Sequence, residues 1–348
     1  MSAKDRARAA GLAACSSSSA GWIGAEMQDA PSRSRRAFRR GWRMLELETV
    51  EYRLPEGRKL HCWLNRPASR VPPAAVAILV PGFGRRMHQH SALCRYLAAN
   101  GIGVVRFDSL DHIGLSDGEI SDYTLSGGLR SLEAAVAVAR DVFPAASYSL
   151  VATSLTSRIA LRYFQRDRTM GRLIAMSGIV NVRKTLAHVL AEDYSTWVES
   201  DLPEKAIFES QSIKMLPLYR DGHGHDWFTL GTTLREIAAL SAPAHWFVGR
   251  DDDWIDRQDI EACAAAHPEQ FLLTWLNSCG HDIGRNASAA RAMMRRIVLL
   301  CLNDPRFGED DIIEPGYNDL LQIALKERRI QRGSGSMMNS RVEVEPAS

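Results

Sequence analysis

Short apolar runs alternate with amphipathic stretches through most of this chain, and this alternation limits the fold more than any other feature. The apolar runs have the length of strands and cover 74–81, 102–107, 148–153, 172–177, 244–249 and 271–276. Stretches with helical spacing lie at 88–99, 126–142, 156–166, 256–266 and 287–303. Strands that are apolar throughout are buried on both faces, as in a parallel sheet covered by helices. The pattern therefore predicts a doubly wound α/β fold with a mostly parallel sheet.

Two intervals depart from this rhythm. Residues 47–54 and 59–64 alternate polar and apolar positions around a Pro-Glu-Gly-Arg turn, which predicts a β-hairpin and gives the sheet an antiparallel start. Residues 181–240 carry helical patches near 182–191 and 232–240 and no strand pattern. We expect this interval, which carries six aromatic residues, to be a helical cap inserted between two late strands.

The two ends of the chain differ from its middle. Residues 1–43 combine Ala, Ser and Gly with a cluster of arginines and lack apolar periodicity, which predicts a disordered basic N-terminal arm. Such an arm is either an extension with no role or a contact for an acidic partner. Residues 318–331 favour a last helix, and residues 333–348 a polar C-terminal tail. The folded domain is therefore expected to cover 44–332.

The overall composition limits the classes of partner. The 43 basic and 41 acidic side chains leave a net charge of +2, so we expect no nucleic acid partner. The six cysteines form no metal-binding or redox spacing, which favours a reducing cytoplasm and neither metal nor cofactor. No window reaches the roughly 18 apolar residues of a membrane-spanning helix. A globular enzyme is the expected class.

A serine lies at the carboxyl end of a predicted strand, where open α/β sheets bind their ligands. The apolar run that ends at Thr153 is followed by Ser154 and then by a helix, which is the context of a nucleophile elbow. Ala152 and Thr156 stand where the elbow motif G-x-S-x-G has glycines, so the motif is incomplete. The alternative is a serine that only caps the helix.

An acid and a histidine follow the last two predicted strands. Asp252 lies after the run 244–249, and His281 lies after the run 271–276. The order Ser, Asp, His and the strand-end position of each residue are typical of the catalytic triad of α/β-hydrolases. Alternatively, the aspartates at 251–253 cap the next helix and the histidine is an exposed loop residue. The coincidence of all three predicts a triad, with either neighbouring aspartate as an alternative acid.

These residue types suit acyl transfer. An imidazole takes the proton of the serine hydroxyl during attack on a carbonyl carbon and returns it to the leaving group. A carboxylate holds the imidazole in the required tautomer. Backbone amides stabilise the oxyanion. We expect those of Leu155, at the start of the helix, and of Phe83, between Gly82 and Gly84 after the first central strand.

Several motifs of this chain are not general to α/β-hydrolases. They are Gly82-Phe83 with Arg85-Arg86-Met87, Arg106-Phe107-Asp108-Ser109-Leu110 with His112, Ser154-Leu155 with Arg158, Val180-Asn181-Val182-Arg183, Asp253-Trp254, His281-Asp282 and Glu314-Pro315. Through them the chain resembles, over roughly 47–330, the acyl transferases of bacterial bioluminescence, which release fatty acids from acyl-carrier-protein thioesters for a reductase. That family also lacks the elbow glycines. The resemblance places the nucleophile on Ser154, the acid on Asp252 and the base on His281.

The resemblance also implies the substrates and partners. It implies cleavage of long-chain acyl thioesters of acyl carrier protein or coenzyme A through an acyl-serine. The acyl group is then released as fatty acid or passed to an acceptor, which includes a downstream enzyme. Arg85 and Arg86, beside the expected oxyanion loop, either contact the phosphate of the donor or form ion pairs with helix carboxylates. The alternatives are an ester hydrolase with the same triad, a thioesterase that releases polyketides, and a non-enzymatic binder.

Overall fold

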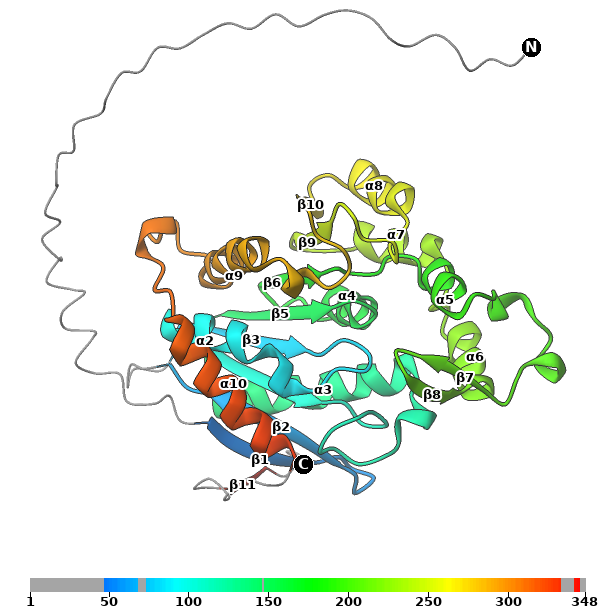
Figure 1. Cartoon of the computed structure of the whole chain (residues 1–348), viewed down its shortest axis with the longest axis horizontal. Coiled ribbons are helices and arrows are strands. Elements are labelled where there is room, and N and C mark those ends of the chain that lie inside the picture. Colours follow the sequence, from blue (N-terminus) through cyan, green and yellow to red (C-terminus); the bar gives the residue numbers. More distant parts are fainter. Residues whose placement is uncertain (1–46, 68–72, 146, 333–340, 345–348) are drawn as a thin grey trace, which may run out of the picture. The chain divides into compact units, whose positions relative to one another are not determined.

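A computed structural model of the chain describes residues 47–67, 73–145, 147–332 and 341–344. Over these residues a nine-stranded sheet has the order β10-β9-β6-β5-β3-β4-β2-β1-β11 (Figure 1). Its strands are β1 Leu47–Arg53, β2 Lys59–Asn65, β3 Ala75–Val80, β4 Gly103–Asp108, β5 Ser147–Thr153, β6 Arg172–Met176, β9 Ala244–Gly249, β10 Phe271–Leu276 and β11 Arg341–Val344. Strand β2 is antiparallel to β1 and β4, and all other neighbours are parallel. The predicted mostly parallel sheet with an antiparallel start is confirmed.

Helices cover both faces of this sheet. They are α2 Ser91–Ala99, α3 Leu125–Val142, α4 Thr156–Arg166, α8 Arg257–Ala266, α9 Ala287–Leu302 and α10 Tyr317–Gln331, with short 3-10 helices η1 Met87–His90, η2 Ile120–Asp122, η5 Ile283–Arg285 and η6 Glu309–Asp311. Alternate side chains of β3 point to opposite faces. Val76 and Ile78 share a core cluster with α3, α4 and α8, whereas Ala77 and Leu79 share one with α2 and α9. The chain is therefore doubly wound.

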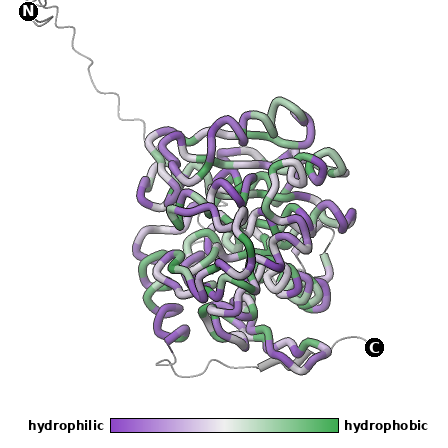
Figure 2. The backbone as a smooth tube through the Cα atoms, turned by 90° about the vertical axis from the view of Figure 1, so that its right-hand side faces the viewer, coloured by the Kyte–Doolittle hydropathy of each residue, from purple (hydrophilic) through white to green (hydrophobic). Residues whose placement is uncertain are grey.

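Hydropathy changes repeatedly between hydrophobic and hydrophilic along the helices (Figure 2), as expected for helices that bury one side on a sheet. None of the helices in the described ranges is long and apolar enough to cross a membrane.

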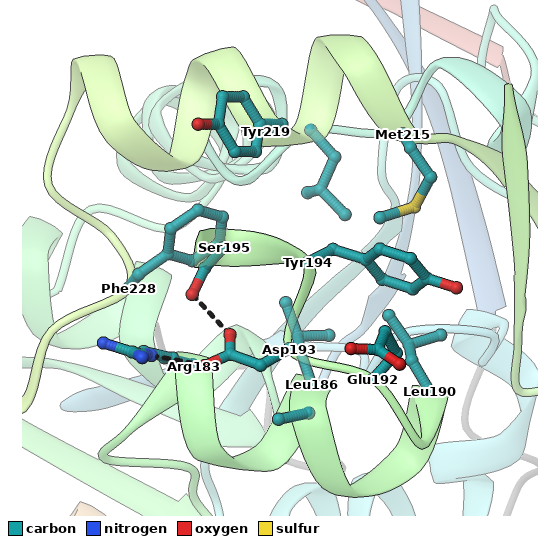
Figure 3. Close-up of a pocket in the computed structure, with 12 residues that line it drawn as sticks. Arg183, Leu186, Leu190, Glu192, Asp193, Tyr194, Ser195, Met215, Tyr219 and Phe228 are labelled. Atoms are coloured by element: carbon teal, nitrogen blue, oxygen red, sulfur yellow. Dashed lines mark hydrogen bonds and ion pairs between the residues drawn. The ribbon is translucent and has the colours of Figure 1, made fainter. Parts of the chain in front are cut away.

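Residues 181–240, for which the sequence predicts a cap, lie between β6 and β9, and we call them the cap. Its elements are α5 Val182–Leu190, η3 Tyr194–Thr196, η4 Glu199–Asp201, β7 Lys205–Phe208, β8 Gln211–Lys214, α6 Met215–Gly224 and α7 Leu230–Ala238. Between α5 and α6 lies a cavity of about 20 Å³, lined by Arg183, Tyr219 and Phe228 among others (Figure 3). Such a volume holds about one water molecule. This cavity is therefore too small for a substrate.

The expectation that the cap has no strand was wrong, because β7 and β8 pair as an antiparallel hairpin. The turn between them consists of Glu209 and Ser210, with φ of 50° and 63°. Two-residue hairpin turns of this left-handed kind usually show Asn or Gly in the sequence. Here neither residue is present, and each strand has only four residues, so the hairpin left no recognisable signal.

Both ends of the chain lie largely outside the described residues, including the basic arm expected at 1–43. The prediction of a polar tail over 333–348 was wrong in one part, because Arg341–Val344 form a strand that pairs in parallel with β1. The physical reason for this pairing is that β1 would otherwise be an edge strand with unpaired backbone N–H and C=O groups. The alternating Arg-Val-Glu-Val sequence suits such a strand.

Helix α10 is anchored to the sheet by a buried ion pair. Arg106 on β4 donates from Nη1 to Oε2 of Glu327 at 2.8 Å and from Nη2 to Oε1 at 2.6 Å. The Arg106 side chain is fully buried and that of Glu327 is 4% exposed. Arg106 also donates to the backbone oxygen of Met87, and Ser91 Oγ donates to Glu327. The pair thus joins α10 to β4, η1 and the start of α2.

We predict that Glu327→Gln lowers the free energy of unfolding by about 3–5 kcal/mol, because it leaves a buried guanidinium without its countercharge. Urea denaturation followed by circular dichroism measures the change. In the control variant Glu48→Gln, which weakens the exposed Arg66–Glu48 pair, the loss should stay below about 1 kcal/mol. A double variant Arg106→Met/Glu327→Met should be more stable than Glu327→Gln, and an equal or larger loss would contradict this explanation.

Candidate active site

Ser154 lies on a sharp turn between β5 and α4, at the carboxyl end of a strand near the middle of the sheet. Its φ is 56°, a left-handed conformation that is rare for serine. The turn is held by β6 and the segment after it, since the Ser154 amide donates to Met176 O at 3.0 Å and its carbonyl accepts from Ile179 N at 3.2 Å. Thr156 closes the turn by donating from Oγ1 to Thr153 O at 2.9 Å. A strained nucleophile turn thus forms without glycines.

The structure brings the three predicted triad residues into one hydrogen-bonded line. Ser154 Oγ lies 2.8 Å from His281 Nε2, and His281 Nδ1 lies 3.0 Å from both carboxylate oxygens of Asp252. The Asp252 side chain is fully buried, and its Oδ1 also accepts from Trp254 N at 3.1 Å. Of the aspartates at 251–253, it is therefore the middle one whose carboxylate faces the imidazole.

The surroundings fix the orientation of His281. Its carbonyl accepts from Ser177 Oγ at 2.8 Å, and the Trp254 ring stacks on the imidazole with centroids 4.4 Å apart. A carboxylate at Nδ1 keeps the proton on that nitrogen and leaves Nε2 as an acceptor for the serine hydroxyl. The arrangement can therefore withdraw a proton from Ser154 Oγ.

Two backbone amides next to Ser154 are available for an oxyanion. In the described part of the chain, the amides of Leu155 and Phe83 donate to no protein acceptor. Leu155 caps the N-terminus of α4, where the helix dipole favours negative charge. At Gly82 a Cβ atom would lie 3.3 Å from Thr153 O, so the loop after β3 packs closely on the end of β5. They are the two amides for which the sequence predicts this role.

His112 supports the loop that carries Phe83. The Gly84 amide donates to His112 Nε2 at 2.9 Å, and burial lowers the pKa of His112 to about 4, so the imidazole is a neutral acceptor at neutral pH. The Phe83 ring stacks on Phe208 at 4.6 Å between centroids and meets Tyr123 and His112 edge to face. This role of His112 was not predicted from the sequence. The available signal was the position of His112 just after the carboxyl end of β4.

The two arginines beside the oxyanion loop occupy different places. Arg85 is 43% exposed, lines the cavity described below and lies 3.6 Å from Glu209 of the cap hairpin. Arg86 precedes η1, and its backbone amide donates to Gln89 Oε1 at 2.7 Å. Arg85 is thus the one placed at the cavity, and it has a carboxylate partner there.

Ser154 and His281 open into a cavity of about 560 Å³. This volume lies within the range of pockets for small molecules, about 300–1,000 Å³. One part of its lining comes from α2, α9 and the start of α10, with side chains such as Leu93, Met294 and Leu320. The described residues of the cap contribute only Phe208 and Glu209, at the tip of the hairpin, to this lining. Of the six aromatic residues of the cap, Phe208 is therefore the one that lines this cavity.

No group of three His, Cys, Asp or Glu side chains among the described residues is placed to hold a metal ion.

The doubly wound sheet and the serine on its strained turn define an enzyme of the α/β-hydrolase fold. Est1E from Butyrivibrio proteoclasticus, solved with ferulic acid, superposes with a TM-score of 0.60 at 15% identity, over 72% of this chain and 98% of its own. A Pyrococcus furiosus esterase gives a TM-score of 0.55 at 16% identity, over 74% of this chain and 90% of its own. These likenesses concern the fold.

The sequence gives a closer relationship. The family model described as acyl transferase matches residues 49–335. An acyl transferase of Aliivibrio fischeri strain MJ11 is 34% identical over 292 residues, which cover 82% of this chain and 94% of that protein. One from Vibrio harveyi is 32% identical over 284 residues, with 80% and 92% covered. The chain belongs to the acyl transferase family, and the relationship predicted from its motifs is confirmed.

We predict that His112→Leu lowers kcat on a p-nitrophenyl acyl ester by about tenfold to a hundredfold with little change in KM. The reason is that the Gly84 amide loses its acceptor and the Phe83 amide shifts from the oxyanion, and a lost oxyanion donor costs about 10²–10³ in kcat. His112→Gln, which keeps a side-chain acceptor, should lose less. Equal losses in the two variants would show that the acceptor is not what matters.

We also predict that acid destabilises the protein through its buried histidines. Burial lowers the pKa values of His112 and His90 to about 4 each, and for His90 the nearby Arg106 and Arg85 add to the effect. An unfolded histidine has a pKa of about 6.5, so between these values the unfolded chain binds more protons. The free energy of unfolding should therefore fall as the pH drops from about 6.5 to about 4, by up to about 3 kcal/mol for each histidine.

Urea denaturation at a series of pH values measures this dependence. His112→Gln should show a shallower slope across the same pH window than the wild type. Parallel slopes would mean that other groups cause the acid sensitivity.

Proposed function

We propose that the protein transfers acyl groups from thioesters of acyl carrier protein or coenzyme A through a covalent acyl-serine at Ser154. The observation that carries this proposal is the hydrogen-bonded line of Ser154, His281 and Asp252 at one end of a largely apolar cavity. Membership of the acyl transferase family supports the reaction class. The apolar lining supports a long hydrocarbon chain as the group transferred.

The first half-reaction acylates the enzyme. Ser154 Oγ attacks the thioester carbonyl carbon while its proton passes to His281 Nε2. The negative oxygen of the tetrahedral intermediate accepts hydrogen bonds from the Phe83 and Leu155 amides. The C–S bond then breaks, and the imidazolium gives its proton to the departing sulfur, which leaves as a thiol. Asp252 stabilises the positive imidazolium throughout.

The second half-reaction releases the acyl group. Water, or a hydroxyl or thiol of an acceptor, attacks the acyl-serine while His281 takes its proton. The Ser154–acyl bond breaks, and the proton returns to Ser154 Oγ. Release to water gives a fatty acid, and transfer gives a new ester or thioester. A downstream enzyme that uses the acyl group fits either product.

Arg85 supports a phosphate-bearing donor. Its guanidinium lines the cavity next to the oxyanion loop, and acyl-carrier-protein and coenzyme A thioesters both carry phosphate at the end of their pantetheine arm. A donor phosphate would compete with Glu209 for Arg85. Arg86 lies beside η1, so we assign the phosphate contact to Arg85 alone.

A second candidate function is hydrolysis of oxygen esters with the same three residues. The structural likeness to a Pyrococcus furiosus esterase supports it, because that esterase has the same fold. Release of polyketide chains differs from the main proposal in the acyl group alone. Competition between a long-chain acyl thioester and a matched p-nitrophenyl ester at equal concentrations separates thioester from ester preference.

We predict that brief mixing with an acyl-coenzyme A adds the mass of one acyl group to the wild type and none to Ser154→Ala. Intact-mass spectrometry measures the adduct, and a series of chain lengths shows which acyl group accumulates most. Ser157→Ala is the matched control, because this buried serine lies one turn further along α4 and should leave the adduct unchanged.

The opposite results are equally informative. An adduct in Ser154→Ala would place the nucleophile elsewhere. The absence of an adduct and of thioester turnover at every chain length, with turnover of the p-nitrophenyl ester, would favour the ester hydrolase.

A further inference from the structure

The cavity beside Ser154 extends away from the catalytic residues along two helices. We call it the acyl groove and define it by its lining from α2, α9 and α10, together with Ser154 and His281. Helix α2 follows the oxyanion loop through η1, and α9 follows His281 through η5, so both helices begin beside the catalytic residues. Lining residues continue along α9 from Ala287 to Met294, which is about 10 Å at 1.5 Å per residue.

The direction of helix α10 shows which end of the groove is remote from Ser154. Its C-terminal part lies at the start of α2, where Glu327 accepts from Ser91 Oγ. The segment before its N-terminus lies near the end of α2, where Glu314 Oε2 accepts from Tyr96 Oη at 3.3 Å. Helix α10 therefore runs opposite to α2, next to it in Figure 1. Pro315 and Tyr317, which line the groove, lie at its far end with Tyr96.

At the far end the groove is lined by the side chain of Tyr96, which cannot move freely. Tyr96 is 2% exposed, and its hydroxyl is bonded to Glu314. Glu314 in turn pairs with Arg295 and lies 3.8 Å from Arg291. Asn100, one turn beyond Tyr96, donates to Ile313 O at 2.9 Å and accepts from Ile313 N at 2.8 Å. These contacts hold the segment before α10 against the end of α2.

The groove is apolar between its two polar ends. Ala290 and Ala287 on α9 leave space along the groove, and Leu93, Met293 and Met294 supply apolar walls. At one end are the polar catalytic groups, and at the other are the Tyr96 hydroxyl and the Arg291 guanidinium. A hydrocarbon chain bound at Ser154 is favoured along the middle of this path, and it loses apolar contact where the path reaches Tyr96.

From these contacts we infer that Tyr96 sets the longest acyl chain that the enzyme accepts. The inference rests on the proposed function, because it takes the acyl group of the substrate as the occupant of the groove. Chains that end before the Tyr96 ring gain apolar contact with each added methylene. A longer chain meets a buried ring that is fixed by the Glu314 network, so it must bend out of the groove or displace α10.

The test compares kcat/KM for saturated acyl-coenzyme A thioesters of increasing even chain length. In the wild type we expect a fall of at least about tenfold at the first chain that is too long, the discrimination that a pocket gives for one or two methylenes. In Tyr96→Ala this limit should move to longer chains by one or more two-carbon steps, with shorter chains little affected. Tyr96→Phe keeps the ring and should keep the limit.

Two further variants keep the test decisive. Met294→Trp fills the groove from α9 and should move the limit to shorter chains, which provides a reading even if Tyr96→Ala does not fold. Tyr52→Ala removes another buried tyrosine, on β1, and should leave the limit unchanged. The same limit in wild type, Tyr96→Ala and Met294→Trp, each shown to be folded by cooperative thermal unfolding, would overturn the inference.

Binding of free saturated fatty acids separates this inference from the proposed function, because it needs no turnover. Displacement of a fluorescent fatty acid gives the length limit for binding in wild type and Tyr96→Ala. A limit that shifts in binding, without thioester turnover by either protein, would support the groove and contradict the thioester activity. Thioester turnover with an unchanged limit in both measurements would do the reverse.

Discussion

The active-site geometry depends on the backbone hydrogen bonds that hold Ser154 in a left-handed conformation. The Ser154 amide donates to Met176 O at the end of β6, and the Ser154 carbonyl accepts from Ile179 N just beyond that strand. Strand β5 lies between β3 and β6, so the turn is reached from one side by the oxyanion loop after β3 and from the other by β6. A turn with positive φ is unfavourable for serine in isolation and persists where neighbours determine it. The parallel sheet therefore supplies the strain that presents Oγ to His281.

Two different parts of the structure contact the oxyanion loop and provide space for the proposed acyl chain. The first is the cap, and the second is the groove. The cap touches the site through the hairpin tip, where Phe208 stacks on Phe83 and Glu209 approaches Arg85. It thereby shields and supports the oxyanion loop. The space that we propose for an acyl chain is lined by α2, α9 and α10. A change in the cap should therefore affect the rate of the chemical step more directly than the choice of acyl group.

Much of this arrangement could be predicted from the sequence, for reasons that are physical. Continuous apolar runs identify buried parallel strands, and strand ends in such a sheet converge, so Ser154, Asp252 and His281 could be placed together before any coordinates. The β7–β8 hairpin was missed because its turn has neither Asn nor Gly. The acyl groove was missed because periodicity identifies the buried side of each helix but not the space left between three helices. The support from His112 was missed because a single loop histidine has many possible partners.

Helix α10 is tied at both ends, by Glu314 to Tyr96 and by Glu327 to Arg106. These two contacts therefore do not involve the strand ends that carry the nucleophile, the base and the acid. Mutations along its groove-facing side can change the shape of the substrate site while the reacting groups stay in place. In evolutionary terms, α10 is a separable module through which descendants of one ancestral enzyme can diverge in acyl preference and retain the same chemistry.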